Sequence, residues 1–224
     1  MRAAVPALRV GEASYTATAA GLVATASGDV WGWSKDVLLY IKATTLKVAE
    51  MGYGILCARR DVQWVLNTFT SEYTRRLADA ARAGSFPINM PLDVRVTGVD
   101  DAHAVGVADA RPPLLSALKP VRRRPEWDAV VWLNALDLTG TRDAPAFKAE
   151  LEAWITRTFD GRRALARVEW SKGWAYDARG PWRSHLLGAA GAPYGRSRST
   201  AASIFSRLDP HGVFRTPLID HILG

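Results

Sequence analysis

The chain has 224 residues, of which 48% are hydrophobic and 23% charged, and its formal net charge is +7. This length suits one large domain or two small ones, and the composition is that of a globular chain rather than a disordered one. No segment holds the roughly 18 uninterrupted apolar residues of a membrane-spanning helix, so we expect none. The basic residues are mostly scattered arginines. The densest run, residues 122–124, lies between Pro120 and Pro125, which favours a loop.

Residues 1–27 form a lead-in segment rich in Ala, Gly and Thr. Glu12 interrupts any apolar stretch, so we recognise no signal peptide and expect a short helix or an irregular segment. Cys57 is the single cysteine and the four histidines are dispersed, without the spacing typical of zinc ligands. We therefore expect no intrachain disulfide and no metal site.

Residues 37–58 predict a β-hairpin. Residues 37–41 are apolar, and residues 44–50 alternate between apolar and polar side chains. We interpret Met51 and Gly52 as a turn and residues 53–58 as the second strand.

Residues 60–83 predict a long amphipathic helix. Asp61 is the candidate N-cap, and Gly84 is expected to end the helix. Apolar residues recur at helical spacing between them: Val62, Val65, Leu66, Phe69, Tyr73, Leu77 and Ala80.

Residues 91–98 read as a strand in which apolar and polar side chains alternate, and so leave opposite faces. We expect the apolar face, with Leu92, Val94 and Val96, to pack against a core. Asp93 and Arg95 leave the other face, close enough to form an ion pair. If that face meets water, the pair contributes little to stability. If it lines a cavity, the pair lies where a ligand arrives.

The remaining elements complete an α+β fold. We expect a loop over residues 100–126, a strand over 129–136, a cap at 141–143 before a helix that reaches residue 159, and a strand over 164–170. After residue 172 the chain is rich in loops, with a short helix over 199–207. The prediction is a mostly antiparallel, ferredoxin-like sheet with helices packed on one face, and with the opposite face free.

Several polar residues on the predicted strands would share that free face. Asn134 interrupts an apolar strand, where it either satisfies a neighbouring backbone group or faces a site. Glu169 and Lys172, considered alone, are expected at the surface. Together they would give an apolar pocket with a few oriented polar groups. The combined set is Glu50, Asp93, Arg95, Trp132, Asn134, Glu169, Trp170 and Lys172.

Four segments carry a resemblance to a known family. They are GDVWGWSKDVLLYI at 28–41, PLDVRVTGVD at 91–100, EWSKGWAY at 169–176 and LDPHGVF at 208–214. Together they resemble the C-terminal half of the class II cholesterol oxidases, flavoproteins of the vanillyl-alcohol oxidase superfamily with covalently attached FAD. The last segment recurs widely in the superfamily, whereas the first three are more specific.

The resemblance implies a sterol cavity between the sheet and a flavin. The sterol 3-hydroxyl carbon gives a hydride to FAD, oxygen reoxidises the flavin, and a carboxylate then moves a proton as the double bond shifts. Arg95 matches the arginine of the family motif, and Asp93 stands where the family usually has Glu, so its reach is one methylene shorter. Asn134 and Glu50 match polar cavity residues. Trp132 is assigned with them to substrate binding, and Lys172 is assigned weakly to cofactor binding.

The resemblance also suggests how the chain is divided. Residues 28–165 would form the substrate-binding (cap) domain, and residues 166–224 would return to an FAD-binding domain. The histidine of the covalent FAD link belongs to that other domain in the family, so we expect this chain alone to be a truncated or split part without activity. A separate FAD-binding chain is one implied partner. The family is largely secreted, but the localisation of this chain stays undetermined.

Two alternatives remain open from the residues. The chain could be a stand-alone α+β module that binds a hydrophobic ligand without redox chemistry. Its charge and the arginine run at 122–124 also leave a basic nucleic-acid-binding protein as a weaker alternative. No glycine-rich nucleotide loop, zinc-finger spacing or RNP-like motif occurs.

Overall fold

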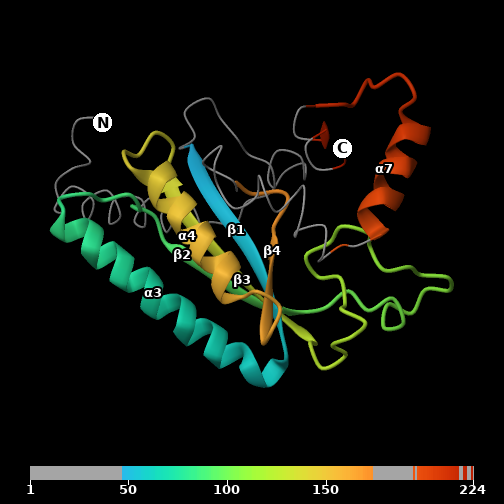
Figure 1. Cartoon of the computed structure of the whole chain (residues 1–224), viewed down its shortest axis with the longest axis horizontal. Coiled ribbons are helices and arrows are strands. Elements are labelled where there is room, and N and C mark those ends of the chain that lie inside the picture. Colours follow the sequence, from blue (N-terminus) through green and yellow to red (C-terminus); the bar gives the residue numbers. More distant parts are fainter. Residues whose placement is uncertain (1–46, 174–193, 195, 217–218, 221–222, 224) are drawn as a thin grey trace, which may run out of the picture.

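The computed structural model describes residues 47–173, 194, 196–216, 219–220 and 223. Within them the chain runs through six main elements and then a separate helix, α7 (Figure 1). Their bounds are β1 Val48–Cys57, α3 Val62–Arg82, β2 Leu92–Gly98, β3 Ala129–Leu138, α4 Ala144–Thr158, β4 Ala164–Val168 and α7 Arg196–Leu208. A short 3-10 helix, η1, spans Arg59–Asp61 between β1 and α3.

The four strands form one sheet in the order β2-β3-β1-β4, and every neighbouring pair is antiparallel. This β-α-β-β-α-β chain order is the ferredoxin-like arrangement. The structure confirms the predicted α+β class, the antiparallel sheet, the long helix and the loop over residues 100–126. The strand β4 crosses the expected boundary at residue 165, and the division into segments stays a prediction.

Helices α3 and α4 cover one face of the sheet (Figure 1). From α3, Val65 and Phe69 are fully buried, and from α4, Leu151 and Ile155 are fully buried. They pack on alternate strand residues such as Tyr53 and others that point to the same face. The apolar spacing that predicted the helix over residues 60–83 is therefore the spacing of this core.

The two ends of α3 are held differently. At its end, Gly84 has φ +74° and the Ser85 N–H donates to the Ala80 carbonyl, a Schellman closure that favours glycine. At its start, Asp61 occupies the N-cap position, but its carboxylate makes no capping bond. It accepts two bonds from Arg163 instead, at 2.6 and 2.9 Å, so the predicted side-chain cap is wrong.

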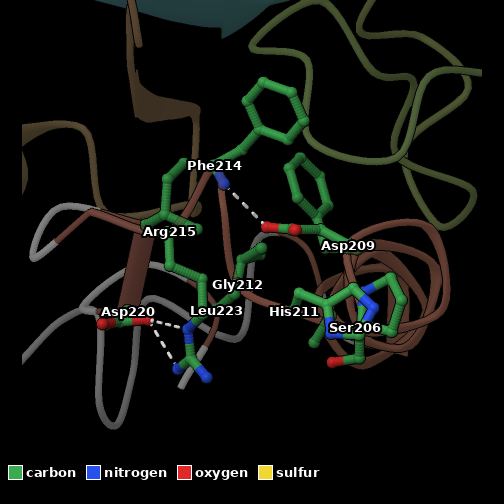
Figure 2. A pocket seen from close by; sticks show the side chains of 12 residues that line it. Ser206, Asp209, His211, Gly212, Phe214, Arg215, Asp220 and Leu223 are labelled. Carbon is green, nitrogen blue, oxygen red and sulfur yellow. Dashed lines mark hydrogen bonds and ion pairs between the residues drawn. The ribbon is translucent and has the colours of Figure 1, made fainter.

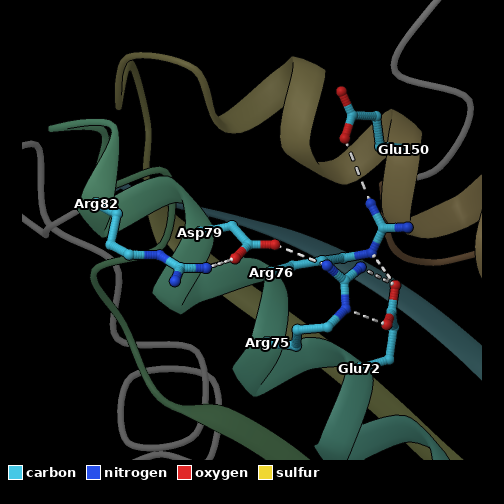
Figure 3. A network of polar contacts seen from close by, with 6 residues as sticks. All are labelled: Glu72, Arg75, Arg76, Asp79, Arg82 and Glu150. Atoms are coloured by element: carbon cyan, nitrogen blue, oxygen red, sulfur yellow. Dashed lines mark hydrogen bonds and ion pairs between the residues drawn. The ribbon is translucent and has the colours of Figure 1, made fainter.

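A polar network on the outer surface links α3 to α4 (Figure 3). Glu72 accepts two hydrogen bonds from Arg75 and one from Arg76, and these lower the pKa of its carboxyl, Arg75 having the largest effect. Arg76 also reaches Glu150 of α4 at 3.3 Å. Because these side chains are at or near the surface, the network orients the helices more than it stabilises them.

Two polar pairs lie inside the helix-covered core. The Tyr53 hydroxyl donates to Glu152 Oε1 at 2.6 Å, and Lys148 forms an ion pair with Asp137. Lys148 and Glu152 are at most 1% exposed, one helical turn apart on α4. Burial raises the pKa of Asp137, against the opposing effect of Lys148. Both pairs join α4 to the sheet beneath it.

The turn predicted at Met51 and Gly52, inside the expected hairpin of residues 37–58, is wrong. β1 runs without interruption from Val48 to Cys57 and pairs with β3 over all ten residues. Gly52, interpreted as part of a turn, lies in the middle of the strand opposite Asn134. A side chain added at this position would meet neighbouring side chains. The predicted strand 37–41 and the lead-in segment 1–27 lie outside the described residues.

Two further expectations about the faces are corrected. On β2, Leu92 packs on the core, but Val94 and Val96 are 36% and 52% exposed, because β2 is an edge strand. The sheet face opposite the helices is not wholly free either. Loop residues such as Leu118 and Trp127 pack on Leu56 and Val130, so the loop covers the apolar end of that face.

Candidate functional site

On the side of the sheet opposite α3 and α4, the loop over residues 100–126 covers one end. The other end, here called the open face, carries a polar cluster. Strand residues directly opposite in an antiparallel pair leave the same side of the sheet. Asp93 of β2 lies opposite Asn134 of β3, which lies opposite Gly52 of β1. The next row along the strands joins Arg95, Trp132 and Gly54. Sheet register thus gathers residues that are up to 82 positions apart in sequence.

Asn134 is the centre of the cluster and is fully buried. Its side-chain Nδ2 donates to Glu50 Oε1 at 2.7 Å and to Glu169 Oε2 at 2.8 Å. Its Oδ1 accepts a longer bond, 3.4 Å, from Arg95 Nη2. Bonds to carboxylates are roughly twice as strong as neutral ones. The amide therefore fixes two carboxylates that would otherwise repel each other.

The turn after β4 brings Glu169 and Lys172 next to β1. The Glu169 N–H donates to the Gly52 carbonyl, and the Gly173 N–H donates to the Glu50 carbonyl at 2.7 Å. Between them Lys172 Nζ reaches Glu50 Oε2 at 2.7 Å. Glu50 is therefore held from two sides, by an ammonium group and by the Asn134 amide.

Asp93 and Arg95 form the exposed rim of the cluster. Arg95 Nε lies 3.2 Å from Asp93 Oδ2, and its Nη2 lies 3.6 Å from Glu169 Oε2. The side chains of Asp93 and Arg95 are 46% and 49% exposed, against 16% for Glu169. The predicted ion pair is present, and the cluster becomes more accessible from Asn134 outward to this pair.

Trp132 provides the apolar border of the rim. The Arg95 guanidinium carbon lies 5.8 Å from the centre of the indole ring, and the indole N–H donates to Thr97 Oγ1 at 3.0 Å. These two contacts hold the ring beside the charged pair. An aromatic ring with oriented polar groups beside it is the type of lining found in sites for an apolar molecule that bears one polar group.

The structure thus brings together the residues that the sequence singled out as substrate-binding, Glu50, Asn134 and Trp132, with the Asp93–Arg95 pair and Lys172. Glu169 and Lys172 belong to the same set, with side chains that are 16% and 28% exposed. Trp170 departs from the expected set. It packs on the helix-side core and on Tyr194, and its indole N–H donates to the Leu115 carbonyl.

Gly52 is the residue that the sequence interpretation missed. A Cβ atom at this position would lie 2.7 Å from Lys172 Cγ, 2.9 Å from Asn134 Nδ2 and 2.9 Å from Glu169 Oε2. The signal was present in the period-two pattern, because Glu50, Gly52 and Gly54 alternate with buried apolar residues. A glycine inside a strand pattern often marks such a close approach.

A hollow of about 570 Å³ lies beside α7, away from this cluster (Figure 2). The predicted helix over residues 199–207 is confirmed there as α7, and the LDPHGVF segment follows it. The Asp209 carboxylate accepts bonds from the backbone N–H groups of Val213 and Phe214, and Arg215 pairs with Asp220. Gly212 has φ +66°, which completes the turn. The contacts explain this motif as the closure of a loop.

The described part of the chain shows two further absences. It contains no group of three His, Cys, Asp or Glu residues arranged to hold a metal ion. None of its helices combines the length and apolar character needed to cross a membrane.

Cys57 lies in the core, where burial, with smaller effects of Asp61 and Asp128, raises the pKa of its thiol to about 11.

Comparison with known proteins agrees with this geometry. A family model described as cholesterol oxidase, substrate-binding, matches residues 2–224. The structure is similar to that of the cholesterol oxidase from B. sterolicum, with a TM-score of 0.78 and 36% identity over 96% of this chain and 41% of that one. It is also similar to a solvent-stable cholesterol oxidase, with a TM-score of 0.73 and 40% identity over 92% of this chain and 40% of that one. No curated protein sequence matches.

The chain spans about two fifths of the length of these two relatives. The family model, by contrast, covers essentially the whole chain. The open face with its polar cluster lies within the matched region. The chain therefore belongs to the cholesterol oxidase substrate-binding family.

Proposed function

We propose that the open face binds a 3-hydroxysterol and that this chain is the substrate-binding portion of an FAD-dependent cholesterol-type oxidase. The observation that carries the proposal is the half-exposed Asp93–Arg95 pair, which lies beside Trp132 and above the buried Asn134 amide. The family model and the two similar cholesterol oxidases support it.

The residues suggest how a sterol would be oriented. Its rings are flat and apolar, so they would pack against Trp132. Its 3-hydroxyl would then lie near Arg95, whose guanidinium is half-exposed and still has donors to offer. Arg95 would donate to the hydroxyl oxygen, while the contacts to Asp93 and Asn134 hold the guanidinium in place.

The shift of the double bond requires a carboxylate that takes a proton from one carbon and returns it to another. Three carboxylates line the cluster. Glu50 and Glu169 are mostly buried and each accepts a bond from the Asn134 amide. Asp93 is 46% exposed, so it is the carboxylate that a sterol would meet first. We assign the proton transfer to Asp93.

The residues fit only the ring end of FAD. Lys172 and Arg95 could donate to the polar edge of an isoalloxazine, where bound FAD would supply the hydride acceptor. The phosphates need unpaired N–H groups, such as a helix N-terminus offers. Asp61 precedes the first residue of α3 and Asp143 precedes that of α4, and a carboxylate at these two helix starts disfavours a phosphate. We infer that firm FAD binding uses the residues of a separate domain or chain.

Binding experiments test the sterol proposal. Titration of the 224-residue chain with cyclodextrin-solubilised cholesterol, followed by tryptophan fluorescence, is expected to show saturable binding. Cholestane, which lacks the hydroxyl, should bind about tenfold more weakly, because a hydrogen bond to a charged group is lost. Arg95→Met should remove this difference, whereas Arg82→Met, on the outer surface of α3, should preserve it. Equal affinity of the wild type for both ligands would contradict the proposal.

A flavin measurement tests the cofactor assignment separately. After incubation with FAD and gel filtration, the chain alone is expected to retain little visible flavin absorbance. A stoichiometric, acid-stable flavin band would show that the chain holds the cofactor itself.

A further inference from the structure

We propose that Gly52 is a positioning residue: its missing side chain is what allows Asn134, Glu169 and Lys172 to converge over the sheet. The relevance of Gly52 to catalysis rests on the proposed function. The convergence of the three side chains is a feature of the structure and does not depend on it. The three side chains come from β3 and from the turn after β4, and they meet above the Cα atom of a third segment, β1.

The space above Gly52 is fully used. A Cβ at this position would lie within 3.0 Å of one atom from each of the three side chains, which is closer than such contacts are found. Two of these atoms, Asn134 Nδ2 and Glu169 Oε2, are hydrogen-bonded to each other at 2.8 Å. One methyl group at residue 52 must therefore move the donor and the acceptor of the same bond.

Backbone conformation does not explain this glycine. Gly52 pairs with Asn134 inside a regular ladder, and it is absent from the glycines with positive φ. An alanine could adopt the same extended backbone without strain. What alanine cannot do is share the space, so the requirement for glycine comes from the cluster above the strand.

Two other glycines on strands provide matched comparisons. At Gly54 the nearest atoms to an added Cβ would be Val130 Cγ1 at 3.1 Å and Trp132 Cζ3 at 3.3 Å. At Gly98 nothing lies within 4 Å. Substitution by alanine should therefore displace the polar cluster strongly at residue 52. At residue 54 it should displace Trp132 to a smaller extent, and at residue 98 it should displace nothing.

The test is the side-chain amide NMR signal of Asn134 in the free, full-length chain. Its two N–H protons each donate to a carboxylate, so they should resonate away from ordinary Asn amides. Gly52→Ala is expected to shift this signal toward ordinary values while the backbone signals of the core stay in place. Gly98→Ala should leave it unchanged. A general structural role would disturb the core signals together with the amide.

Sterol affinity is the second readout. Gly52→Ala should weaken cholesterol binding by about tenfold or more, the scale of one lost charge-assisted bond. If the wild-type chain does not bind sterol, the proposed function fails, and the amide signal alone decides the role of Gly52. An Asn134 signal that is unchanged in Gly52→Ala overturns the inference.

A second variant covers the case in which Gly52→Ala does not fold. The additional change Lys172→Ala removes the nearest of the three atoms. The double variant is expected to regain a folded core and to show a displaced Asn134 signal. A double variant that remains unfolded, or that shows the wild-type amide signal, overturns the inference.

Discussion

Replacing Asn134 by Asp tests the centre of the polar cluster with almost no change in side-chain shape. In the native chain the amide donates to Glu50 at 2.7 Å and to Glu169 at 2.8 Å. The substitution Asn134→Asp removes both donated hydrogens and places a third carboxyl beside two carboxylates. The position is fully buried, so water cannot replace the lost donors.

The size of the effect follows from these contacts. Two hydrogen bonds to charged groups contribute about 1.5–3 kcal/mol each, so their loss costs about 3–6 kcal/mol. Two like charges 4 Å apart add about 4 kcal/mol at an effective dielectric constant near 20. Full ionisation of all three carboxyls would therefore cost about 7–10 kcal/mol, which is comparable to the typical stability of a whole domain, about 5–15 kcal/mol. The folded variant should keep a proton in the cluster instead.

Proton retention fixes the sign of the pH dependence. The folded variant then binds more protons than the unfolded chain, so its stability falls as pH rises above the usual carboxyl range. We expect the free energy of unfolding to drop by about 3–6 kcal/mol at pH 8 and by clearly less at pH 5. The cations Arg95 and Lys172 reduce this difference but do not reverse it, because carboxyls still outnumber them in the cluster.

The assay is urea unfolding of wild type and variant, followed by tryptophan fluorescence at both pH values. Asn67→Asp is the matched control. Asn67 is exposed on α3, and its Oδ1 accepts from Gln63, a bond that an Asp retains. The control should change stability by less than about 0.5 kcal/mol. A loss below about 1 kcal/mol at pH 8, or an equal loss at both pH values, would refute the reasoning.

Three further substitutions test the helix-covered core and the end of α3. Tyr53→Phe removes the buried hydrogen bond to Glu152 and should lower the free energy of unfolding by about 1.5–3 kcal/mol, measured by urea denaturation. Lys148→Met leaves Asp137 buried without its cation and should lower the free energy of unfolding by about 3–5 kcal/mol. The added change Asp137→Leu should restore a large part of this loss, and no restoration would contradict a buried ion pair. Gly84→Ala places a side chain at φ +74°, which should cost about 1 kcal/mol of stability and so lower the thermal unfolding midpoint. An unchanged midpoint would contradict the Schellman closure at the end of α3.

Elements with a strong local signal could be predicted from the sequence. The helix over residues 60–83 carries its own apolar period, so only its ends needed tertiary information. The N-cap position shows this. Asp61 has a side chain that is typical of a helix cap, yet its carboxylate accepts hydrogen bonds from Arg163, 102 residues away in sequence. Local capping and a distant ion pair compete for one group, and no sequence pattern near Asp61 reveals which prevails.

Errors on the strands have a different cause. Val94 and Val96 have the alternation of a half-buried strand, and they are exposed because β2 lies at the edge, beyond the reach of the helices. Leu56 and Val130 face away from the helices and are fully buried because a long loop folds over them. Alternation fixes which side chains share a face, whereas coverage of that face depends on segments elsewhere in the chain.

The polar cluster shows how much sheet order adds to strand pattern. The alternation of β2 already put Asp93 and Arg95 on one face, and the lone polar residue in β3 already drew attention to Asn134. What joins them to Glu50 and Lys172 is the position of β1 between β3 and β4. A ferredoxin-like fold requires that order, so an unbroken β1 would have placed the strand with Glu50 and Gly52 next to the strand with Asn134. The interpretation of Gly52 as a turn removed that inference, because it divided in two the strand on which the cluster is built.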